Sequence, residues 1–394
     1  MSSNICSLFS QTIRSVVDEE TFLRALHEPA FDQDDILCVT DTVKSGWVSY
    51  QGGMVSLFQR DLESYLGEEY HVVPVVNGTS ALFLSLKCLE IGDQDEVLVP
   101  AITFIATSNA VCHTGAYPHF IDVCPKTLGI DCDKLDIYLS SNTHFDDQGF
   151  LVNKHTKKII KAIIPVHTLG SSFDIDGIKK ISQKYNLHII EDAAEGLGSS
   201  YKTKKVSALT GLGILSFNGN KIITTGGGGA IVSSDKIFME KVHHLSTTAK
   251  KNHRFEFDHD AIGYNLRLPA LNAALGHTQL KKIDIFVNKK RDLYNRYKNA
   301  LDDLKIGTVF NPDTFGNSNC WLNAFILNED QKHLKNIILD HLNDNGIAAR
   351  PLWRPLHLLE IYKNYPKSPC PNAENLYERI ICLPSSPSLV NSYA

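Results

Sequence analysis

The chain has 394 residues, 43% of them hydrophobic and 21% charged, and a formal net charge of -5. These values are typical of a globular protein with room for two domains, and they offer no basic surface for nucleic acid or an anionic membrane. The nine scattered cysteines form no CxxC pair and have no matching His spacing, so we expect reduced thiols and no metal site. Without a signal-like start or a long apolar run, the sequence predicts a cytoplasmic protein with no membrane anchor.

The first segment is polar and irregular, with a weak helical pattern near residues 16–27. It predicts an N-terminal arm or capping helix over residues 1–30. Residues 34–46 have helical apolar spacing, and Gly46 is placed to end that helix. The glycine-punctuated loop that contains Trp47 either joins two helices or lines the mouth of a ligand site.

From residue 71 onward, short apolar strands alternate with amphipathic helices. This pattern predicts an α/β fold with a mainly parallel sheet covered on both faces. Gly78, Thr79 and Ser80 follow the first strand and open a helix. Their amide groups, hydroxyls and positive helix end predict an anion site, although Thr79 or Ser80 would serve equally well as a plain N-cap.

Two further residues lie just past the ends of predicted strands. Phe104 is placed either to stack on a flat ligand or to fill the core. Asp192 falls where open parallel sheets bind ligands, and it either caps a turn or keeps a ligand's ring nitrogen protonated. Between them, the polar residues 138–158 predict a surface hairpin or insertion.

Lys221 lies between an apolar strand that ends near Phe217 and the four glycines Gly226–Gly229, which lead into another strand. Glycines permit backbone conformations and close approaches that other residues exclude. Taken locally, a lone lysine here is either an ordinary solvated residue or an amine held beside a phosphate-bearing cofactor.

The last third of the sequence predicts a second domain. A loop near residues 262–269 is followed by one long helix over residues 270–304, and residues 321–350 predict two strands around a helix. We therefore expect a large domain over residues 31–265 and a smaller C-terminal α+β domain over residues 266–394.

Four features fall together at the carboxyl ends of predicted strands: the Gly78–Ser80 turn, Phe104, Asp192, and Ser216 with Lys221. They supply a phosphate cup, a stacking ring, a carboxylate for a ring nitrogen and an amine nucleophile. Together they describe a site for pyridoxal phosphate.

The same motifs resemble the DegT/DnrJ/StrS sugar aminotransferase family over about residues 30–390. The shared motifs are Ser45–Ser49, Asn77–Leu82, Val99–Pro100, Thr103–Phe104, Ala106–Ala110, Pro165–His167, Glu191–Ala194, Ser216–Phe217, Asn220–Lys221, Thr224–Gly226 and Gly263–Arg267. The resemblance implies the type I pyridoxal-phosphate fold of aspartate aminotransferase and a homodimer with shared active sites.

The resemblance also assigns roles to residues. It implies that Lys221 forms the Schiff base with the cofactor and that Asp192 holds the pyridine nitrogen. The other cofactor-binding residues that it implies are Gly78, Thr79, Ser80, Phe104, Glu195, Ser216 and, for the neighbouring subunit's phosphate, Asn265. The substrate contacts that it suggests are Trp47, Asn220, Trp353, Arg354 and His357.

Glu195, the insertion at residues 140–157, the N-terminal arm and residues 218–229 resemble one branch of the family, which acts in legionaminic acid and bacillosamine pathways. Members of that branch aminate C4 of a UDP-linked 4-keto-6-deoxy-N-acetylglucosamine. The resemblance thus implies L-glutamate as donor, that nucleotide sugar as acceptor, and a bacterial surface glycan or nonulosonic acid as product. A GDP- or dTDP-linked 4-keto-6-deoxyhexose, as in perosamine synthesis, is the alternative acceptor.

Three other functions are less well supported by the sequence. Pyridoxamine-dependent sugar dehydratases of the family carry histidine where Lys221 stands. A regulatory or scaffold protein that keeps the fold without catalysis would not need every catalytic position filled. A Rossmann dehydrogenase is disfavoured because the glycine run leads into a strand and not into a helix.

Overall fold

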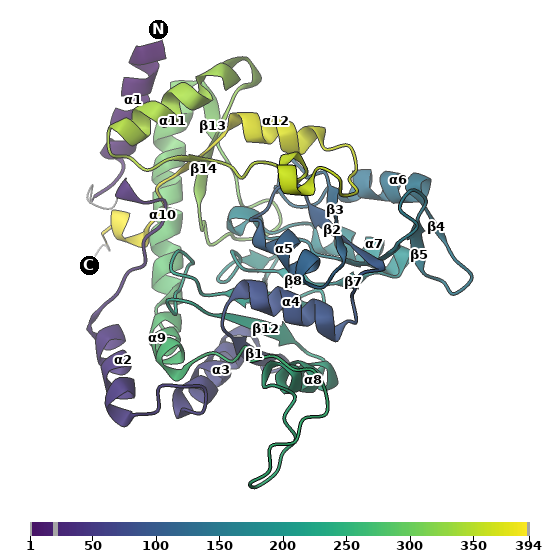
Figure 1. Cartoon of the computed structure of the whole chain (residues 1–394). Coiled ribbons are helices and arrows are strands. Elements are labelled where there is room, and N and C mark those ends of the chain that lie inside the picture. The colour runs from purple at the N-terminus through teal and green to yellow at the C-terminus, as the bar shows by residue number, and fades with distance from the viewer. Residues whose placement is uncertain (1, 19–22, 392–394) are drawn as a thin grey trace.

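The computed structural model of the chain describes residues 2–18 and 23–391. A mixed sheet lies at its centre (Figure 1). Its strands are β1 (His71–Val75), β2 (Asp95–Pro100), β3 (Tyr117–Ile121), β4 (Thr143–Phe145), β5 (Leu151–Asn153), β6 (Ile159–Ile163), β7 (His188–Ile189), β8 (Glu191–Asp192), β11 (Leu212–Ser216) and β12 (Gly229–Ser233). One part has the order β1-β12-β11-β8 and the other β3-β2-β6-β5-β4. They are continuous because β7 pairs with β6, and the same stretch of chain continues into β8.

Helices pack on both faces of this sheet. They are α3 (Gly53–Leu66), α4 (Gly78–Cys88), α5 (Ala106–His113), α6 (Cys132–Asn142), α7 (Ile175–Tyr185), α8 (Lys236–Ser246) and α9 (Ala270–Leu280). Helix α2 (Gln33–Ser45) lies outside this layer and packs on α9. Strand β2 shows the alternation that this layering requires. Val97 and Val99 belong to the apolar cluster of α4 and α5, whereas Leu98 belongs to that of α6 and α7. Successive side chains of a strand point to opposite faces, so an all-apolar strand is buried from both sides.

A second, antiparallel sheet forms the C-terminal part, with the order β13-β14-β16-β15. Its strands are β13 (Gly307–Val309), β14 (Asn323–Leu327), β15 (Arg350–Pro351) and β16 (Ile380–Leu383), and its helices are α10 (Ile283–Leu301), α11 (Lys335–Asp344) and α12 (Pro371–Arg379). Helix α1 (Ser2–Ser15) joins this part and places Phe9 edge-to-face on Phe325, with ring centroids 5.1 Å apart. These elements match the predicted smaller α+β unit.

The single helix predicted over residues 270–304 is wrong, because α9 ends at Leu280 and α10 begins at Ile283. Neither glycine nor proline marks the break. Its cause is tertiary, since α9 packs on α2 and α3 whereas α10 packs on α1 and β13. Lys282, between the two helices, forms ion pairs with Asp32 (2.8 Å) and Asp35 (2.5 Å). The domain boundary after residue 265 stays a prediction.

At the N-terminus, the helix predicted near residues 16–27 falls partly on residues 19–22, which lie outside the described residues. The helix observed is α1, which ends at Ser15. Its apolar residues Cys6, Phe9 and Ile13 recur at helical spacing and are fully buried. This buried stripe, and not the weaker pattern after it, determines where the helix forms.

The insertion is a hairpin, as predicted, in which β4 and β5 pair antiparallel. It is tied to the sheet by the buried carboxylate of Glu96, which accepts hydrogen bonds from Asn153 (3.0 Å) and Thr156 and contacts His119 (2.7 Å). A buried carboxylate is stable only when its oxygens are paired in this way. The polar residues of the insertion therefore serve partly to satisfy Glu96.

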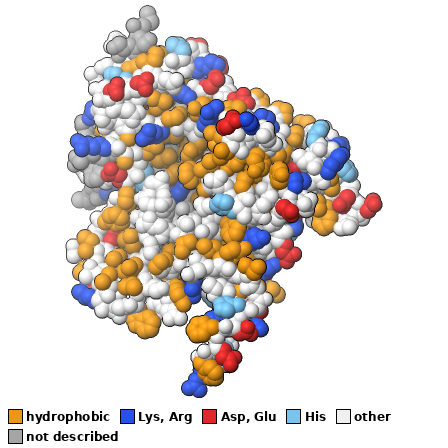
Figure 2. All heavy atoms as spheres, in the orientation of Figure 1, with side chains coloured by type: hydrophobic (Ala, Val, Ile, Leu, Met, Phe, Trp, Pro, Cys, Tyr) orange, Lys and Arg blue, Asp and Glu red, His pale blue; other side chains and the backbone are white. Residues whose placement is uncertain are grey.

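A long loop between α8 and α9 projects from the body (Figure 1) and exposes Phe255, Phe257 and Ile262. The face drawn in Figure 2 carries interspersed basic and acidic side chains with hydrophobic ones between them.

All nine cysteines are free. Among the described residues, no helix is long and apolar enough to cross a membrane.

The glycine run provides a test of local packing. A Cβ on Gly229 would lie 2.5 Å from the Asn77 carbonyl carbon and 2.7 Å from the Gly78 nitrogen, whereas one on Gly227 would meet only the Val76 oxygen at 4.0 Å. We expect Gly229→Ala to lower the free energy of unfolding by about 1–3 kcal/mol, because backbone must shift to admit the methyl group. Gly227→Ala is the matched control and should be near neutral in urea unfolding. Equal effects of the two substitutions would contradict this packing argument.

Candidate active site

The candidate site is built where three strands end. Asp192 is the last residue of β8 and Ser216 the last of β11, and these strands are parallel neighbours. Strand β1 runs in the same direction, because β12 is antiparallel to both β1 and β11. The carboxyl ends therefore meet at one edge, and a Cβ on Gly78 would lie 3.0 Å from the Cβ of Ser216.

The first turn of α4 is the place where the anion site is predicted. Asn77 is the N-cap and accepts a hydrogen bond from the Ser80 amide at 2.7 Å, so the alternative of Thr79 or Ser80 as cap is wrong. Within the described residues, the amides of Gly78 and Thr79 donate no hydrogen bond. Two free amides at the positive end of a helix, with uncommitted hydroxyls beside them, suit a phosphate group.

Asp192 is a buried carboxylate with few partners. One oxygen accepts a hydrogen bond from the Thr107 hydroxyl at 2.9 Å and the other from the Ala194 amide at 3.2 Å. Burial raises the pKa of Asp192, although these hydrogen bonds and the charge of Lys221 act in the opposite direction. A carboxylate in this condition is suited to a cationic partner such as a protonated ring nitrogen.

Lys221 is also buried, with 9% of its surface exposed. Its Nζ lies 3.5 Å from Glu195 Oε1 and 4.1 Å from the centroid of the Trp321 ring. The loop is fixed on both sides of the lysine, because the Lys221 amide donates to the Asn218 carbonyl and the Asn220 carbonyl accepts from Trp321 Nε1. The local alternative of an ordinary solvated lysine is therefore wrong.

Glu195 lies beside that amine. Its second oxygen accepts a hydrogen bond from the amide of Leu169, which has a left-handed backbone conformation with φ of 56°. Burial raises the pKa of Glu195 to about 7, although the charge of Lys221 opposes the shift. Glu195 is thus able to gain or lose a proton near neutral pH.

Three residues of the site were not assigned a role from the sequence: Thr107, Asn319 and Trp321. Thr107 lies inside a recognised motif, but nothing in the motif indicates that its hydroxyl reaches Asp192. Asn319 donates hydrogen bonds from its amide to the carbonyls of Glu195 and Leu197, both at 2.8 Å. The sequence around Asn319 and Trp321 does not indicate a role in the site, because both residues lie in the C-terminal part of the chain and reach the site only through tertiary packing.

The other predicted residues are spread more widely. Phe104, Trp47, Asn220, Asn265 and Arg354 are exposed, which leaves the Phe104 ring open to a stacking partner. The Asn265 side-chain oxygen accepts hydrogen bonds from Arg267, the nearer at 2.9 Å. Their predicted contacts with cofactor or substrate stay predictions.

Two of the predicted substrate contacts are less exposed. Trp353 stacks on Trp321, with ring centroids 6.3 Å apart and planes inclined by 15°. His357 is buried, and its Nε2 lies 3.0 Å from a carboxylate oxygen of Glu374 on α12. Of the two, only Trp353 is linked to the Lys221 cluster by a contact.

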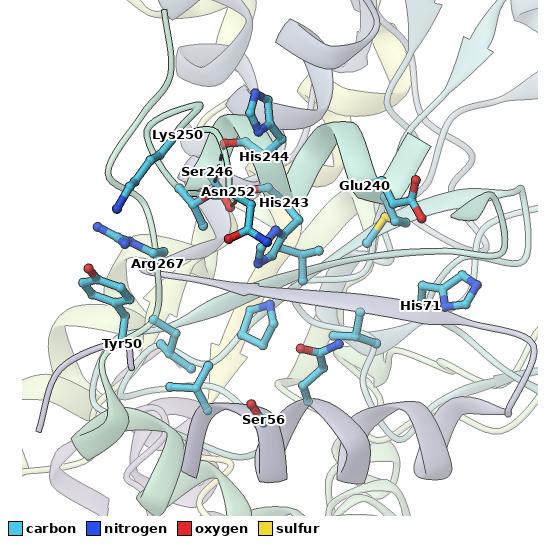
Figure 3. Close-up of a pocket in the computed structure, with 18 of the residues that line it drawn as sticks. Tyr50, Ser56, His71, Glu240, His243, His244, Ser246, Lys250, Asn252 and Arg267 are labelled. Carbon is cyan, nitrogen blue, oxygen red and sulfur yellow. Dashed lines mark hydrogen bonds between the residues drawn. The ribbon is translucent and has the colours of Figure 1, made fainter. Parts of the chain in front are cut away.

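A cavity of about 1300 Å³ lies outside this cluster, between α3, β1, α8 and the start of the projecting loop (Figure 3). Tyr50 and Arg267 lie at one end of it, with the guanidinium carbon 3.2 Å from the Tyr50 ring centroid, and His71 lies at the other end. Its lining includes neither Lys221 nor Asp192. The size of this cavity is therefore no guide to the chemistry.

The donor set around Lys221 fits pyridoxal phosphate. The two free amides at the start of α4 suit the phosphate, and the buried Asp192 carboxylate suits the pyridine nitrogen. The Lys221 amine suits the aldehyde. Each of these groups would otherwise be left without a full set of partners.

Comparisons with known proteins identify the family to which the chain is similar. The model of the DegT/DnrJ/EryC1/StrS aminotransferase family matches residues 29–393. The chain is 35% identical to a putative pyridoxal phosphate-dependent aminotransferase, EpsN of Bacillus subtilis (89% of this chain, 88% of EpsN). It is 34% identical to GDP-perosamine synthase of Escherichia coli O157:H7 (93% and 94%). Helicobacter pylori PseC, an aminotransferase involved in the biosynthesis of pseudoaminic acid, superposes with a TM-score of 0.81 at 28% identity (91% and 93%).

The buried Glu195 predicts a pH dependence of stability in the cofactor-free protein. Its pKa rises from 4.5 to about 7 on folding, so the folded chain holds a proton that the unfolded chain has released between those values. The free energy of unfolding should therefore fall as pH rises through this window, by up to about 3 kcal/mol relative to Glu195→Gln, which cannot titrate. Urea unfolding between pH 5 and 8 measures the difference.

The control for this experiment is Glu68→Gln, which changes an exposed glutamate. It should leave the pH profile of the wild type unchanged. Parallel profiles for the wild type and Glu195→Gln would show that Glu195 does not bind the extra proton.

Proposed function

The chain belongs to the DegT/DnrJ/EryC1/StrS aminotransferase family, and we propose that it transfers an amino group from L-glutamate to C4 of a nucleotide-linked 4-keto-6-deoxy sugar. The protein is a pyridoxal phosphate-dependent nucleotide-sugar aminotransferase of the type I fold. In the proposed reaction glutamate leaves as 2-oxoglutarate and the sugar ketone leaves as an amine. The two substrates exchange an amino group for a carbonyl oxygen, so no outside oxidant or reductant is required.

The observation that carries this proposal is the buried amine of Lys221 among buried carboxylates. Its Nζ lies 3.5 Å from Glu195, and its charge acts on both Glu195 and Asp192. A purely structural lysine is seldom placed where two carboxylates have raised pKa values, whereas catalytic groups commonly are. This cluster also disfavours the non-catalytic alternative.

Pyridoxal phosphate, when bound, supplies an aldehyde that accepts amino groups and a ring that withdraws electrons. Lys221 would hold the cofactor through its amine and, once released, would take the proton from Cα of the donor amino acid. The Asp192 carboxylate, which accepts a hydrogen bond from Thr107, would keep the ring nitrogen protonated. Gly78, Thr79, Ser80 and Ser216 would hold the phosphate.

Glu195 gives the site a second group that can hold a proton close to Lys221. The Leu169 amide fixes one carboxyl oxygen, so the other stays directed at the amine. With a pKa of about 7 the carboxyl group is able to accept or donate a hydrogen bond. We propose that it faces the cofactor's ring oxygen, where relatives often carry histidine or glutamine.

We propose a homodimer in which Asn265 reaches the phosphate in the neighbouring subunit. The exposed apolar side chains on α2 and its flanking segments support an interface there, and they are Phe31, Ile36, Leu37, Val43, Trp47, Val48 and Tyr50. Light scattering of the purified protein should give twice the mass of one chain. A monomer that turns over at full rate would exclude a shared site.

For the acceptor we propose UDP-4-keto-6-deoxy-N-acetylglucosamine, in the biosynthesis of legionaminic acid, bacillosamine or a related surface glycan. The support is the sequence pattern of Glu195, residues 218–229 and the β4–β5 hairpin. The similarity to GDP-perosamine synthase favours a GDP-linked 4-keto-6-deoxyhexose as the second candidate. We place the enzyme in the cytoplasm, where its nine free thiols stay reduced.

Substitution of Lys221 tests the reaction. Lys221→Ala should abolish turnover, with a loss of at least about 1,000-fold, because both the covalent anchor and the proton-transfer group are removed. The absorption band of the lysine-bound cofactor should disappear as well. Lys204→Ala removes an exposed lysine and is the matched control, with turnover expected at the wild-type rate. Glutamate-dependent turnover by Lys221→Ala would refute the proposed role.

A panel of acceptors tests the substrate. The purified enzyme is incubated with glutamate and with UDP-, GDP- and dTDP-linked 4-keto-6-deoxy sugars, and the amino sugar is detected by mass spectrometry. We expect the UDP-linked N-acetyl sugar to have the highest kcat/KM. Reaction of a GDP- or dTDP-linked sugar alone would overturn the proposed acceptor but not the aminotransferase chemistry.

A further inference from the structure

We propose that Trp321 is a positioning residue for the Lys221 amine. The indole face of Trp321 holds this amine while the lysine is not bound to the cofactor and transfers protons. The proposal rests on the proposed function of Lys221 as the acid/base of the reaction. The contact itself does not depend on that function, because it joins two side chains of this protein and involves no cofactor or substrate.

The contact has the geometry of a cation–π interaction. Lys221 Nζ lies 4.1 Å from the centroid of the Trp321 ring, and indole has the most negative face of the aromatic side chains. Trp321 is only 3% exposed. Water therefore competes little for the ammonium group, and such a contact is stronger here than at the surface.

The indole ring is fixed in place on several sides. Its Nε1 donates to the carbonyl of Asn220, the residue before Lys221, at 2.7 Å. Its backbone amide donates to the side-chain oxygen of Asn319 at 2.8 Å, and Trp353 stacks on its plane. A ring held in this way presents the same face to Lys221 at all times.

Asn319 links Trp321 to Glu195, the other residue that contacts the Lys221 amine. Its side-chain amide donates to the Glu195 carbonyl, while its oxygen accepts from Trp321. The close approach depends on Gly170, where a Cβ would lie 2.0 Å from the Asn319 oxygen. One short segment of the C-terminal part therefore sets the positions of both the indole face and the turn that carries Glu195.

An aromatic face suits a lysine that must alternate between acid and base. A carboxylate attracts an ammonium but also accepts its hydrogen bond and competes for its proton. The indole face attracts the charge and accepts no proton, so it restrains the amine without removing its ability to give up a proton. Loss of Trp321 should accordingly slow proton transfer by Lys221 more than it weakens substrate binding.

The other explanation is that Trp321 only fills space in the core. Trp321→Phe and Trp321→Leu distinguish the two, because phenylalanine keeps an aromatic face, although a weaker one, and leucine has none. In the holoenzyme with glutamate we expect kcat to fall by about 3-fold in Trp321→Phe and by about 10- to 30-fold in Trp321→Leu, with KM changed by less than about 2-fold.

The matched control is Phe325→Leu, which truncates a fully buried aromatic residue on β14. It should lower thermal stability and leave kcat unchanged. Tryptophans with increasing fluorine content, incorporated only at position 321, keep the ring shape and weaken its negative face. A graded fall of kcat along this series is expected of a charge-holding ring and not of a space-filling one.

A double-mutant cycle measures the contact without activity. The cofactor-free wild type, Trp321→Leu, Lys221→Met and the double variant are compared by urea unfolding. If the contact stabilises the chain, the two substitutions should be non-additive by about 3- to 30-fold in the unfolding equilibrium constant.

The outcomes separate this proposal from the proposed function. A wild-type kcat in Trp321→Leu, a flat fluorination series or an additive cycle would each overturn the role of Trp321 and leave the role of Lys221 intact. Turnover in Lys221→Ala would overturn the proposed function, while the unfolding cycle would still report whether the two side chains interact.

Discussion

The structure of the site depends on burying an amine and two carboxylates within one small volume. Each of Asp192, Glu195 and Lys221 would be costly to bury alone, because an isolated charge loses its hydration. Together they offset part of this cost, and Thr107 and the amides of Leu169 and Ala194 each donate one hydrogen bond to a carboxylate oxygen. The sheet makes this possible, since neighbouring strands end at one edge and the loops that follow them bring residues from distant sequence positions together there.

The parts of this arrangement that were predictable are those with a local cause. An apolar strand followed by a helix-opening turn indicates a strand end, so Gly78, Asp192 and Lys221 could be placed at one edge from the sequence. Trp321 and Asn319 could not, because their role arises only when the C-terminal sheet packs against the Lys221 loop. The break in the helix predicted over residues 270–304 was missed for the same reason. It falls at Lys281 and Lys282, and its cause is tertiary packing, which the local sequence pattern does not indicate.

The groups that we propose for the cofactor and for the acceptor sugar come from different parts of the chain. The groups that suit the cofactor lie on the central sheet, whereas Trp321 and Trp353 come from the C-terminal part and stack on each other. Trp353 is one of the substrate contacts that the family resemblance suggests. Because the two rings stack, a movement of Trp353 would also displace the Trp321 ring, which contacts the Lys221 amine.

The packing of α1 carries a consequence for the way in which the chain folds. The Asp18 amide donates to the carbonyl of Leu389, the Asp18 carboxylate pairs with Arg296, and Arg14 donates to the carbonyl of Asn345. Contacts at such sequence separation are expected to form late in folding, after more local structure is present. During synthesis, α1 must wait for nearly the whole chain to emerge from the ribosome before its apolar stripe is covered, which leaves that stripe open to chaperones in the interval.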